Sequence, residues 1–135
     1  MAGRVNFELV SPERVLVSDT FDMVVIPGGD GDIGVLPDHA PLISTIRPGV
    51  IDIHDDGKVA HQVFVAGGFA EVLPDRCTVL AEKALMVASI DASDVRARIE
   101  AAELDLRDAE SDADRTRARD ELAILNAMLE AVPDS

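Results

Sequence analysis

Glycine and aromatic residues are confined to the first part of this chain, and that asymmetry constrains the fold more than any other feature. All nine glycines lie at or before Gly68, and all four phenylalanines lie at or before Phe69. The last third consists mainly of Ala, Leu, Asp, Glu and Arg, most of which favour helices. The sequence therefore predicts two domains, residues 1–88 and residues 89–135, with the boundary near Ala88.

Short β-branched runs recur between turn signals throughout residues 1–88. About ten such runs, at a spacing of roughly eight residues, are typical of an antiparallel β-sandwich or barrel. In chain order they are VNFELV, RVLVSD, FDMVVIP, DIGVLP, LISTI, VIDIH, VAHQVFVA, FAEVLP, CTVLAE and ALMVAS.

Two glycine-containing turns make this prediction more specific. Asp56-Gly57 is a two-residue hairpin signal, which would place Asp55 opposite Lys58 and Ile53 opposite Ala60. Gly67-Gly68, between VFVA and FAEV, marks either a bulge or a tight corner.

Residues 89–135 read as two helices, about 91–110 and about 114–132. Asp91 is the expected N-cap of the first helix. The apolar seam of that helix repeats at spacings of four, three, four and three, through Val95, Ile99, Ala102, Leu106 and Ala109. A break at Ser111 to Asp114 makes the two helices antiparallel neighbours.

The second helix has a similar seam and additional apolar residues beside it. Its seam consists of Ala118, Leu122, Leu125 and Leu129, and the helix ends before Pro133. Ile124, Met128 and Val132 lie off that seam and are expected to need a second covering surface, either the β domain or another protein.

Net charge excludes several partners. The chain has 12 basic and 26 acidic residues, a formal net charge of −14. This sign argues against nucleic acid and against anionic lipid, because both bind clustered cations. The single cysteine, Cys77, allows no internal disulfide and favours a reducing compartment.

No segment is expected to enter a membrane. The N-terminus MAGRVNFELV lacks the apolar core of a signal peptide. No apolar run approaches the roughly 20 residues that cross a bilayer. A soluble chain without direct membrane insertion is the expectation.

The sequence patterns that could indicate a metal or phosphate site are incomplete. His54 and His61 lie on opposite arms of the predicted hairpin near Asp52 and Asp55, but a metal would need a third, well-oriented ligand. An exposed polar strand face is the simpler interpretation, so we expect no metal. The glycines at 28, 29, 31 and 34 lack the Lys-Ser/Thr pair and the helix of a phosphate loop, so we expect turns and no cofactor.

Asp32 and Asp38 flank His39 in a pattern that suggests acid/base chemistry. However, a catalytic carboxylate needs burial or a charged neighbour to shift its pKa, and the Pro37 to Pro41 segment is expected to be short, stiff and exposed. A rigid loop loses little entropy when a partner binds. We therefore expect this loop to present side chains to a partner, with no catalytic residue.

Two motifs identify a family resemblance over nearly the full length. They are GDIGVLPDHAPLISTIRPG at residues 31–49 and VAGGFAEV at residues 65–72. With a helical tail after the strands, the chain resembles the epsilon subunits of bacterial F-type ATP synthases, the counterparts of the mitochondrial delta subunit. The resemblance implies a β-sandwich of about ten strands followed by an antiparallel two-helix hairpin.

The resemblance also implies a function. Such a subunit has no active site, and it belongs to the central stalk that rotates with the membrane c-ring. It links the gamma subunit to the c-ring, couples proton translocation to ATP synthesis, and lies on the cytoplasmic side of the bacterial inner membrane. The implied gamma or c-ring interface consists of Asp32, Pro37, Asp38, His39, Ala40 and Pro41, with Asp32 expected to meet a basic side chain of the c-subunit loop.

Two departures from the family pattern concern the hairpin. ATP-binding members carry I-D-x-x-R-A, whereas here IDASDVRA places Arg96 five residues after Asp91. That shift of two positions rotates Arg96 by roughly 200° around the helix, so we expect no ATP binding.

The second departure concerns contact with the catalytic alpha and beta subunits. In the family, inhibition uses basic residues of the second helix, which here correspond to Arg115, Arg117 and Arg119. No basic residue follows Arg119, and an acidic tip is repelled by an acidic target. We therefore expect weak or absent inhibition of ATP hydrolysis.

Two other classes of protein are less consistent with the sequence. A sugar- or peptide-binding module would need exposed aromatic side chains, and the chain has four Phe and no Trp or Tyr. An enzyme would need a pocket with a shifted titratable group, and no residue pattern indicates one.

Overall fold

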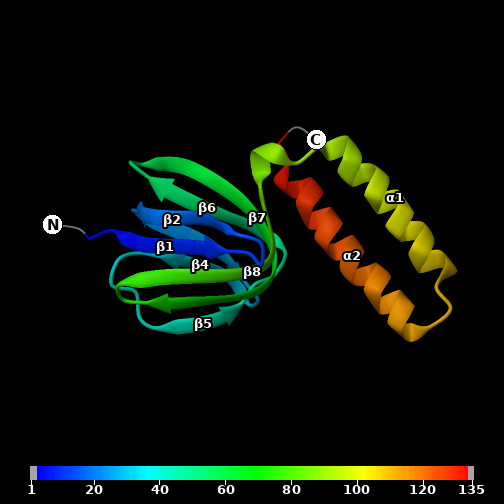
Figure 1. The fold of residues 1–135 in the computed structure, drawn as a ribbon, viewed down its shortest axis with the longest axis horizontal. Helices are drawn as coiled ribbons and strands as arrows, with labels where there is room; N and C mark the ends of the chain where they lie inside the picture. The colour runs from blue at the N-terminus through cyan, green and yellow to red at the C-terminus, as the bar shows by residue number, and fades with distance from the viewer. Residues whose placement is uncertain (1–2, 134–135) are drawn as a thin grey trace. The chain divides into compact units, whose positions relative to one another are not determined.

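The computed structural model describes residues 3–133 and divides the chain into a strand unit and a helical unit (Figure 1). The two units meet between Met86 and Val87. A short 3-10 helix, Val87–Ser89, begins the second unit. The division lies two residues before the boundary expected after residue 88.

Within residues 3–133, the strand unit has eight strands. They are β1 (Val5–Val10), β2 (Val15–Phe21), β3 (Met23–Gly28), β4 (Gly31–Val35), β5 (Leu42–Thr45), β6 (Gly49–Asp55), β7 (Lys58–Leu73) and β8 (Arg76–Met86). The predicted number of about ten is reduced because two long strands each contain two of the predicted runs. VAHQVFVA and nearly all of FAEVLP lie in β7, and CTVLAE and the first half of ALMVAS lie in β8. The second half of ALMVAS is the 3-10 helix Val87–Ser89.

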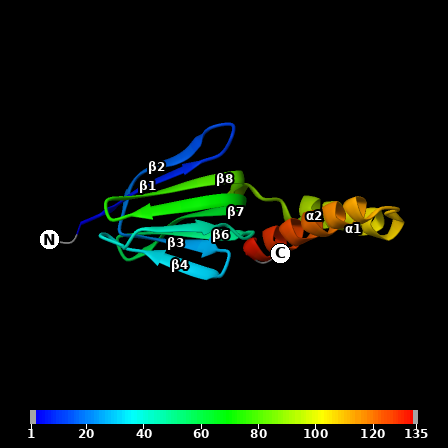
Figure 2. The ribbon, with the colours of Figure 1, turned by 90° about the horizontal axis from the view of Figure 1, so that it is seen from below.

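These strands form a β-sandwich in which β7 and β8 belong to both layers. In one layer, β5 pairs with the second half of β7, which pairs with β8, followed by β1 and β2. In the other layer, the first half of β7 pairs with β6, followed by β3 and β4. Contacts of β1 with β3 and of β2 with β6 join the layers, which Figure 2 shows from the side.

Gly67 and Gly68 lie where β7 passes from one layer to the other. Their φ angles are +73° and +99°, values that side chains other than glycine rarely adopt. The register with β8 is unbroken, since Ala66 pairs with Lys83 and Gly68 pairs with Ala81. The glycines therefore form a corner and not a bulge, the second of the two alternatives that the sequence left open.

The core lies between the layers and consists almost entirely of aliphatic side chains. Period-two alternation places Val5, Phe7 and Leu9 of β1 inside, while Asn6 and Glu8 face solvent. Ile46, which follows β5, and residues from the other strands complete the same core. The strand residues are Phe21, Val24, Ile26, Val35, Ile51, Ile53, Val63, Val65, Ala70, Val72, Cys77, Val79 and Ala81.

The β6–β7 hairpin confirms the turn and corrects part of its register. Asp56 and Gly57 have φ angles of +56° and +80°, as a tight two-residue turn requires. Asp55 pairs with Lys58, as expected. Ile53 pairs with His61 and not with Ala60, because the register shifts between Ile53 and His54.

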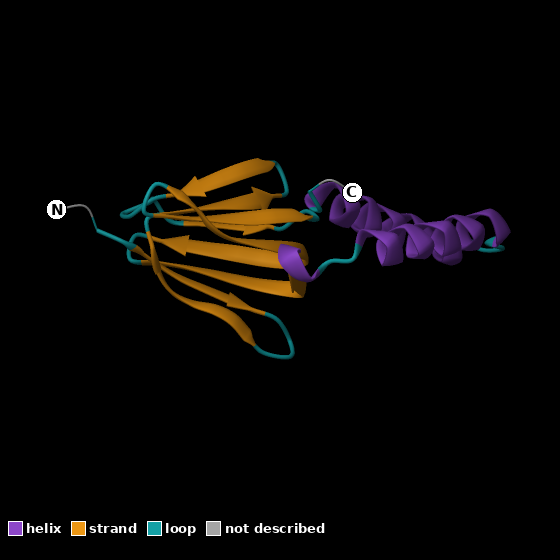
Figure 3. Ribbon diagram, turned by 90° about the horizontal axis from the view of Figure 1, so that it is seen from above, coloured by secondary structure: helices purple, strands orange, loops and turns teal. Residues whose placement is uncertain are grey.

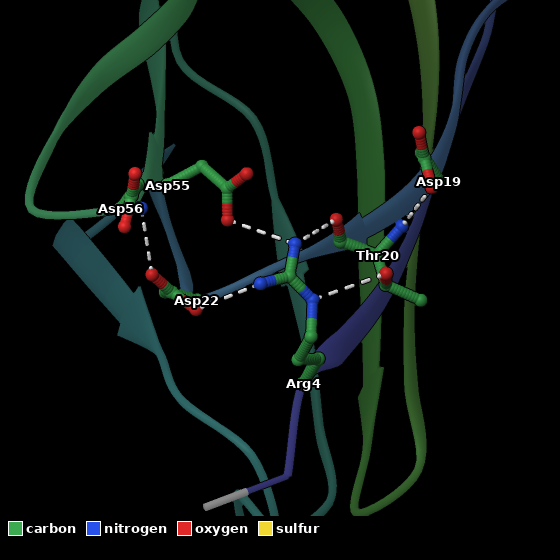
Figure 4. Close-up of polar contacts among 6 residues, drawn as sticks. All are labelled: Arg4, Asp19, Thr20, Asp22, Asp55 and Asp56. Carbon is green, nitrogen blue, oxygen red and sulfur yellow. Dashed lines mark hydrogen bonds and ion pairs between the residues drawn. The ribbon is translucent and has the colours of Figure 1, made fainter.

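Arg4 ties three strand ends together at this hairpin (Figure 4). Its guanidinium binds Asp22 at 3.1 Å and Asp55 at 2.8 Å, and it donates to the Thr20 carbonyl at 2.7 Å. Asp22 also accepts from the backbone N–H of Asp56 at 2.8 Å. Because these groups are partly exposed, the network fixes geometry more than it adds stability.

The helical unit is a pair of helices, α1 (Ala92–Asp108) and α2 (Asp112–Ala131), drawn in purple in Figure 3. The α1 seam is confirmed, since Val95 and Ala102 are buried and the remaining seam residues are half-buried. Across the pair, Arg98 and Glu121 form an ion pair of 3.4 Å.

Two details of α2 differ from the expectation. Ser111 does not belong to an open break: its hydroxyl accepts from the Asp114 N–H and caps α2, which begins two residues earlier than predicted. Met128, which was expected to lie off the seam and to need a covering surface, is as fully buried as Leu125.

Candidate functional site: the β4 edge of the sandwich

The acid at the start of β4 is paired within the chain. Asp32 accepts from the Arg47 guanidinium at 2.5 Å, and the same guanidinium donates to the Gly28 carbonyl at 2.6 Å. The Asp32 side chain is 64% exposed, although it is paired. The sequence singled out Asp32 but missed Arg47, which is 15 residues away and reaches it only through the fold.

The proline-rich loop lies at the other end of β4. Pro37 and Asp38 form a turn in which Asp38 has a φ of +64°. The N–H of Asp38 donates to the Pro74 carbonyl at 3.0 Å, which fixes the loop to the β7–β8 turn. His39 donates from Nδ1 to the Ala40 carbonyl at 2.6 Å, so its ring is oriented by its own neighbour.

Asp32 and this loop lie toward opposite ends of β4. Between Asp32 and Val35 the chain is extended, which separates them by about 10 Å. Asp38, His39, Ala40 and Pro41 therefore lie together at one end of an edge strand, and Asp32 lies near the other. The candidate interface is the whole β4 edge, and the acid/base grouping of Asp32 with His39 is not formed.

Asp32 is part of the lining of a groove in which polar and apolar groups are mixed. The groove lies between β4 and β5 and has a volume of about 380 Å³. Ile33, Leu42 and Ile43 provide its apolar lining, and Asp30, Ser44 and Thr45 add polar groups. Ile43 is 71% exposed, which is unusual for so large an apolar side chain. The edge therefore combines charged and apolar groups, as protein-binding surfaces commonly do.

A second exposed apolar surface lies on the outer face of the other layer. Phe69 pairs with Leu80, and Leu80 pairs with Val10, so three strands contribute to one row. Phe69 and Leu80 are 45% and 41% exposed and line an apolar groove of about 380 Å³. Sequence reasoning missed this surface, although the outward positions of Phe69 and Leu80 in alternating strands were a detectable signal.

The three arginines of α2 differ in their surroundings. Arg115 pairs with Asp112, and Arg117 pairs with Asp114 at 3.1 Å. No ion pair to Arg119 is described within residues 3–133. Two of the three candidate regulatory cations are therefore already paired with acids one helical turn away.

Asp91 acts as the helix cap that the sequence predicted. Its carboxylate accepts from the Ser93 hydroxyl and from the backbone N–H groups of Ser93 and Asp94. The hydrogen bond from the Ser93 hydroxyl, followed by those from the two N–H groups, lowers the pKa of Asp91 below its ordinary value of 3.8. Arg96 is exposed on the helix that this cap begins.

The two histidines of the β6–β7 hairpin lie on its two strands, His54 on β6 and His61 on β7. Among residues 3–133, no group of three or more His, Cys, Asp or Glu side chains could hold a metal ion. His61 packs edge-on against Phe21, with ring centroids 6.0 Å apart. In the helical part of the described chain, neither α1 nor α2 is both long and apolar enough to cross a membrane.

Comparison with known proteins gives consistent full-length relatives. The chain is 54% identical to the ATP synthase epsilon chain of Rhodospirillum rubrum, over 97% of this chain and 98% of that protein. It is also 54% identical to the ATP synthase epsilon chain of Paramagnetospirillum magneticum, over 98% and 99%. The epsilon chain of Maricaulis maris is 46% identical over 95% and 96%.

Solved structures share the fold. One chain of the Euglena gracilis mitochondrial ATP synthase structure, which contains OSCP, F1 and the c-ring, matches with a TM-score of 0.83 at 21% identity. That match covers 95% of this chain and 81% of that chain. A chain of the Tetrahymena thermophila mitochondrial ATP synthase central stalk and c-ring structure matches with a TM-score of 0.66 at 14% identity, over 96% and 97%.

The strand unit also matches a family description directly. Residues 4–87 match the β-sandwich domain of the ATP synthase delta/epsilon chain. That range spans all eight strands and ends at the first residue of the helical unit. On these grounds the chain belongs to the ATP synthase delta/epsilon family, as a relative of the bacterial ATP synthase epsilon chains.

Proposed function

We propose that this chain is a non-catalytic subunit of the central stalk of an F-type ATP synthase, and that it links the gamma subunit to the c-ring. One observation carries the proposal: a single sandwich exposes two separate surfaces of different chemistry. The β4 edge has a paired acid in a groove of mixed polar and apolar lining, and the opposite layer exposes the apolar Phe69–Leu80 row. A subunit that joins two partners requires two such surfaces.

The β4 edge suits the c-ring side of this link. The expected interface residues lie along the edge strand β4 and the loop that follows it. They are Asp32, Pro37, Asp38, His39, Ala40 and Pro41. A carboxylate at the rim of an interface orients a basic partner group and contributes only about 0.2–1 kcal/mol. Repetition of the same contact around a ring would still fix the rotational register.

The Phe69–Leu80 row suits the gamma subunit. Exposed apolar patches on a sheet face are typical of stable protein interfaces, because burying them releases water from apolar surface. In this arrangement the subunit lies peripherally on the cytoplasmic side of the bacterial inner membrane and helps couple proton translocation to ATP synthesis. It needs no cofactor for this role.

Recovery of partners by a tagged copy of the chain from solubilised membranes tests the proposal. The unmodified chain should recover both gamma and the c-ring. Phe69→Glu should reduce recovery of gamma, because it places a charge on the apolar row, whereas Asp32→Lys should weaken the link to the ring. Val59→Glu is a matched control, because Val59 is exposed to 44%, nearly as much as Phe69, but lies in the β6–β7 hairpin.

The two variants also separate the two surfaces. If the unmodified chain recovered neither gamma nor the c-ring, the assignment to the central stalk would be wrong. If Asp32→Lys left both assembly and proton pumping unchanged, the β4 edge would not be the ring contact.

A further inference from the structure

We propose that Arg47 is a positioning residue for the docking of Asp32: it holds the Asp32 carboxylate in a fixed orientation so that one oxygen is presented to a basic group of the partner. This inference rests on the proposed function, because it concerns how the β4 edge meets that partner. It assigns a role to a residue that does not itself need to touch the partner.

Arg47 is anchored to the β3–β4 hairpin by three bonds. Its backbone N–H donates to the Pro27 carbonyl at 3.0 Å, and its guanidinium donates to the Gly28 carbonyl at 2.6 Å. The other guanidinium nitrogen binds Oδ1 of Asp32 at 2.5 Å. Because Pro27 pairs with Asp32 across the hairpin, Arg47 spans both strands at their end.

This arrangement leaves half of the carboxylate available. No hydrogen bond to Oδ2 of Asp32 is described within residues 3–133, and the side chain is 64% exposed. A carboxylate can accept donors on both oxygens at once. A cationic partner group can therefore bind Oδ2 while Arg47 keeps Oδ1.

If Arg47 acted only through its charge, its removal would change partner binding in the opposite direction from that expected if it positions Asp32. Arg47 is a like charge near a site for a cation, so simple electrostatics predicts that its removal would strengthen binding. A fixed carboxylate, however, loses less side-chain entropy on docking than a mobile one. If positioning dominates, removing Arg47 weakens binding although it removes the unfavourable charge.

The neutral Arg47–Asp32 pair also affects how binding depends on salt. A nearly neutral pair contributes little long-range attraction, so association at this contact should depend weakly on ionic strength. Without Arg47, Asp32 carries an unpaired negative charge, and association should become more sensitive to salt while the complex becomes weaker. A merely structural role for Arg47 would not produce this combination.

The experiment measures rebinding of the full-length chain to detergent-solubilised ATP synthase purified from cells that lack it, at low and moderate salt. Arg47→Gln should bind about two- to tenfold more weakly than wild type, the range expected for one side chain that must be ordered. Its association rate should show a steeper salt dependence. Arg47→Lys keeps the charge but lacks the forked guanidinium, so it should also bind more weakly.

Two further variants test whether Arg47 acts through Asp32. In an Asp32→Asn background, Arg47→Gln should cause little additional loss, because the group that Arg47 positions is already altered. Lys58→Gln removes an exposed cation at the start of β7, in the β6–β7 hairpin, and should bind like wild type. Circular dichroism melting of each variant shows that the fold is retained.

The outcomes separate the inference from the proposed function. Failure of the wild-type chain to rebind would overturn the central-stalk assignment itself. Wild-type binding together with equal or tighter binding by Arg47→Gln would overturn only the role of Arg47. The role of Arg47 would also be overturned if Arg47→Gln weakened binding as much in the Asp32→Asn background as it does in the wild-type chain. Arg47 would then act independently of Asp32.

Discussion

Single side chains in this protein take their chemistry from where the fold places them. Cys77 is in the sandwich core with 1% of its surface exposed, and burial raises the pKa of its thiol to about 12. Asp32, by contrast, is an exposed acid that is paired with Arg47. From residue type alone, Cys77 would be a reactive thiol and Asp32 an unpaired carboxylate.

Cys77 should therefore be unreactive in the folded chain. At pH 8 a thiol with a pKa near 12 is almost entirely protonated, whereas one with an ordinary pKa near 8.5 is partly ionised. Reaction with a thiol reagent such as DTNB should be slower in the native state than in urea by a factor on the order of 10³. Rapid stoichiometric labelling of the native protein would contradict this placement of Cys77.

At the scale of elements, the corner in β7 determines how the sandwich closes. Gly68 has a φ of +99°, and a Cβ at this position would meet the Leu80 carbonyl group of β8, whose carbon would be only 2.9 Å away. Gly57, in the β6–β7 hairpin, has a φ of +80°, but a Cβ added there would have no atom within 4 Å. The two glycines therefore share a backbone requirement but differ in the space around them.

This difference makes a matched pair of substitutions informative. Gly57→Ala should lower the free energy of unfolding by about 1–2 kcal/mol, the cost of placing an L-residue at positive φ. Gly68→Ala should cost about 1–3 kcal/mol more, because the β7–β8 backbones must also move apart. Urea unfolding monitored by circular dichroism gives both values, and equal destabilisation by the two variants would show that close packing at the corner is unimportant.

For the whole molecule, the main question is how far the helical unit contributes to function. The residues of the sandwich core belong to the strand unit. In α2, Arg115 and Arg117 are already paired with Asp112 and Asp114. These observations favour a hairpin that contributes little to inhibition through the catalytic alpha and beta subunits.

Deletion of residues 91–135 should therefore leave ATP hydrolysis by the assembled enzyme nearly unchanged. The physical reason is that α2 presents few unpaired cations to an acidic catalytic target and has no basic residue beyond Arg119. Hydrolysis by membranes carrying the full-length and truncated chains measures the effect directly. A large activation on deletion would contradict this prediction and identify the hairpin as a strong inhibitor.

The sequence alone determined the features that depend on local patterns. Short β-branched runs between turn signals identified the strands, and the Asp56-Gly57 signal placed the hairpin turn. The spacing of apolar residues gave the α1 seam, and the position of Asp91 before it gave the cap. These predictions succeeded because each depends on residues that are close in the chain, and the two motifs of the family resemblance are also continuous segments.

Only the tertiary structure decided what depends on residues far apart in the sequence. It joined ten predicted runs into eight strands, paired Asp32 with Arg47, and aligned Phe69 with Leu80 and Val10. It also placed Asp32 near one end of β4 and the Pro37–Pro41 loop beyond the other end. The reason is physical: sheet register and layer crossing are set by packing between strands, and no local pattern records which distant strand becomes the neighbour.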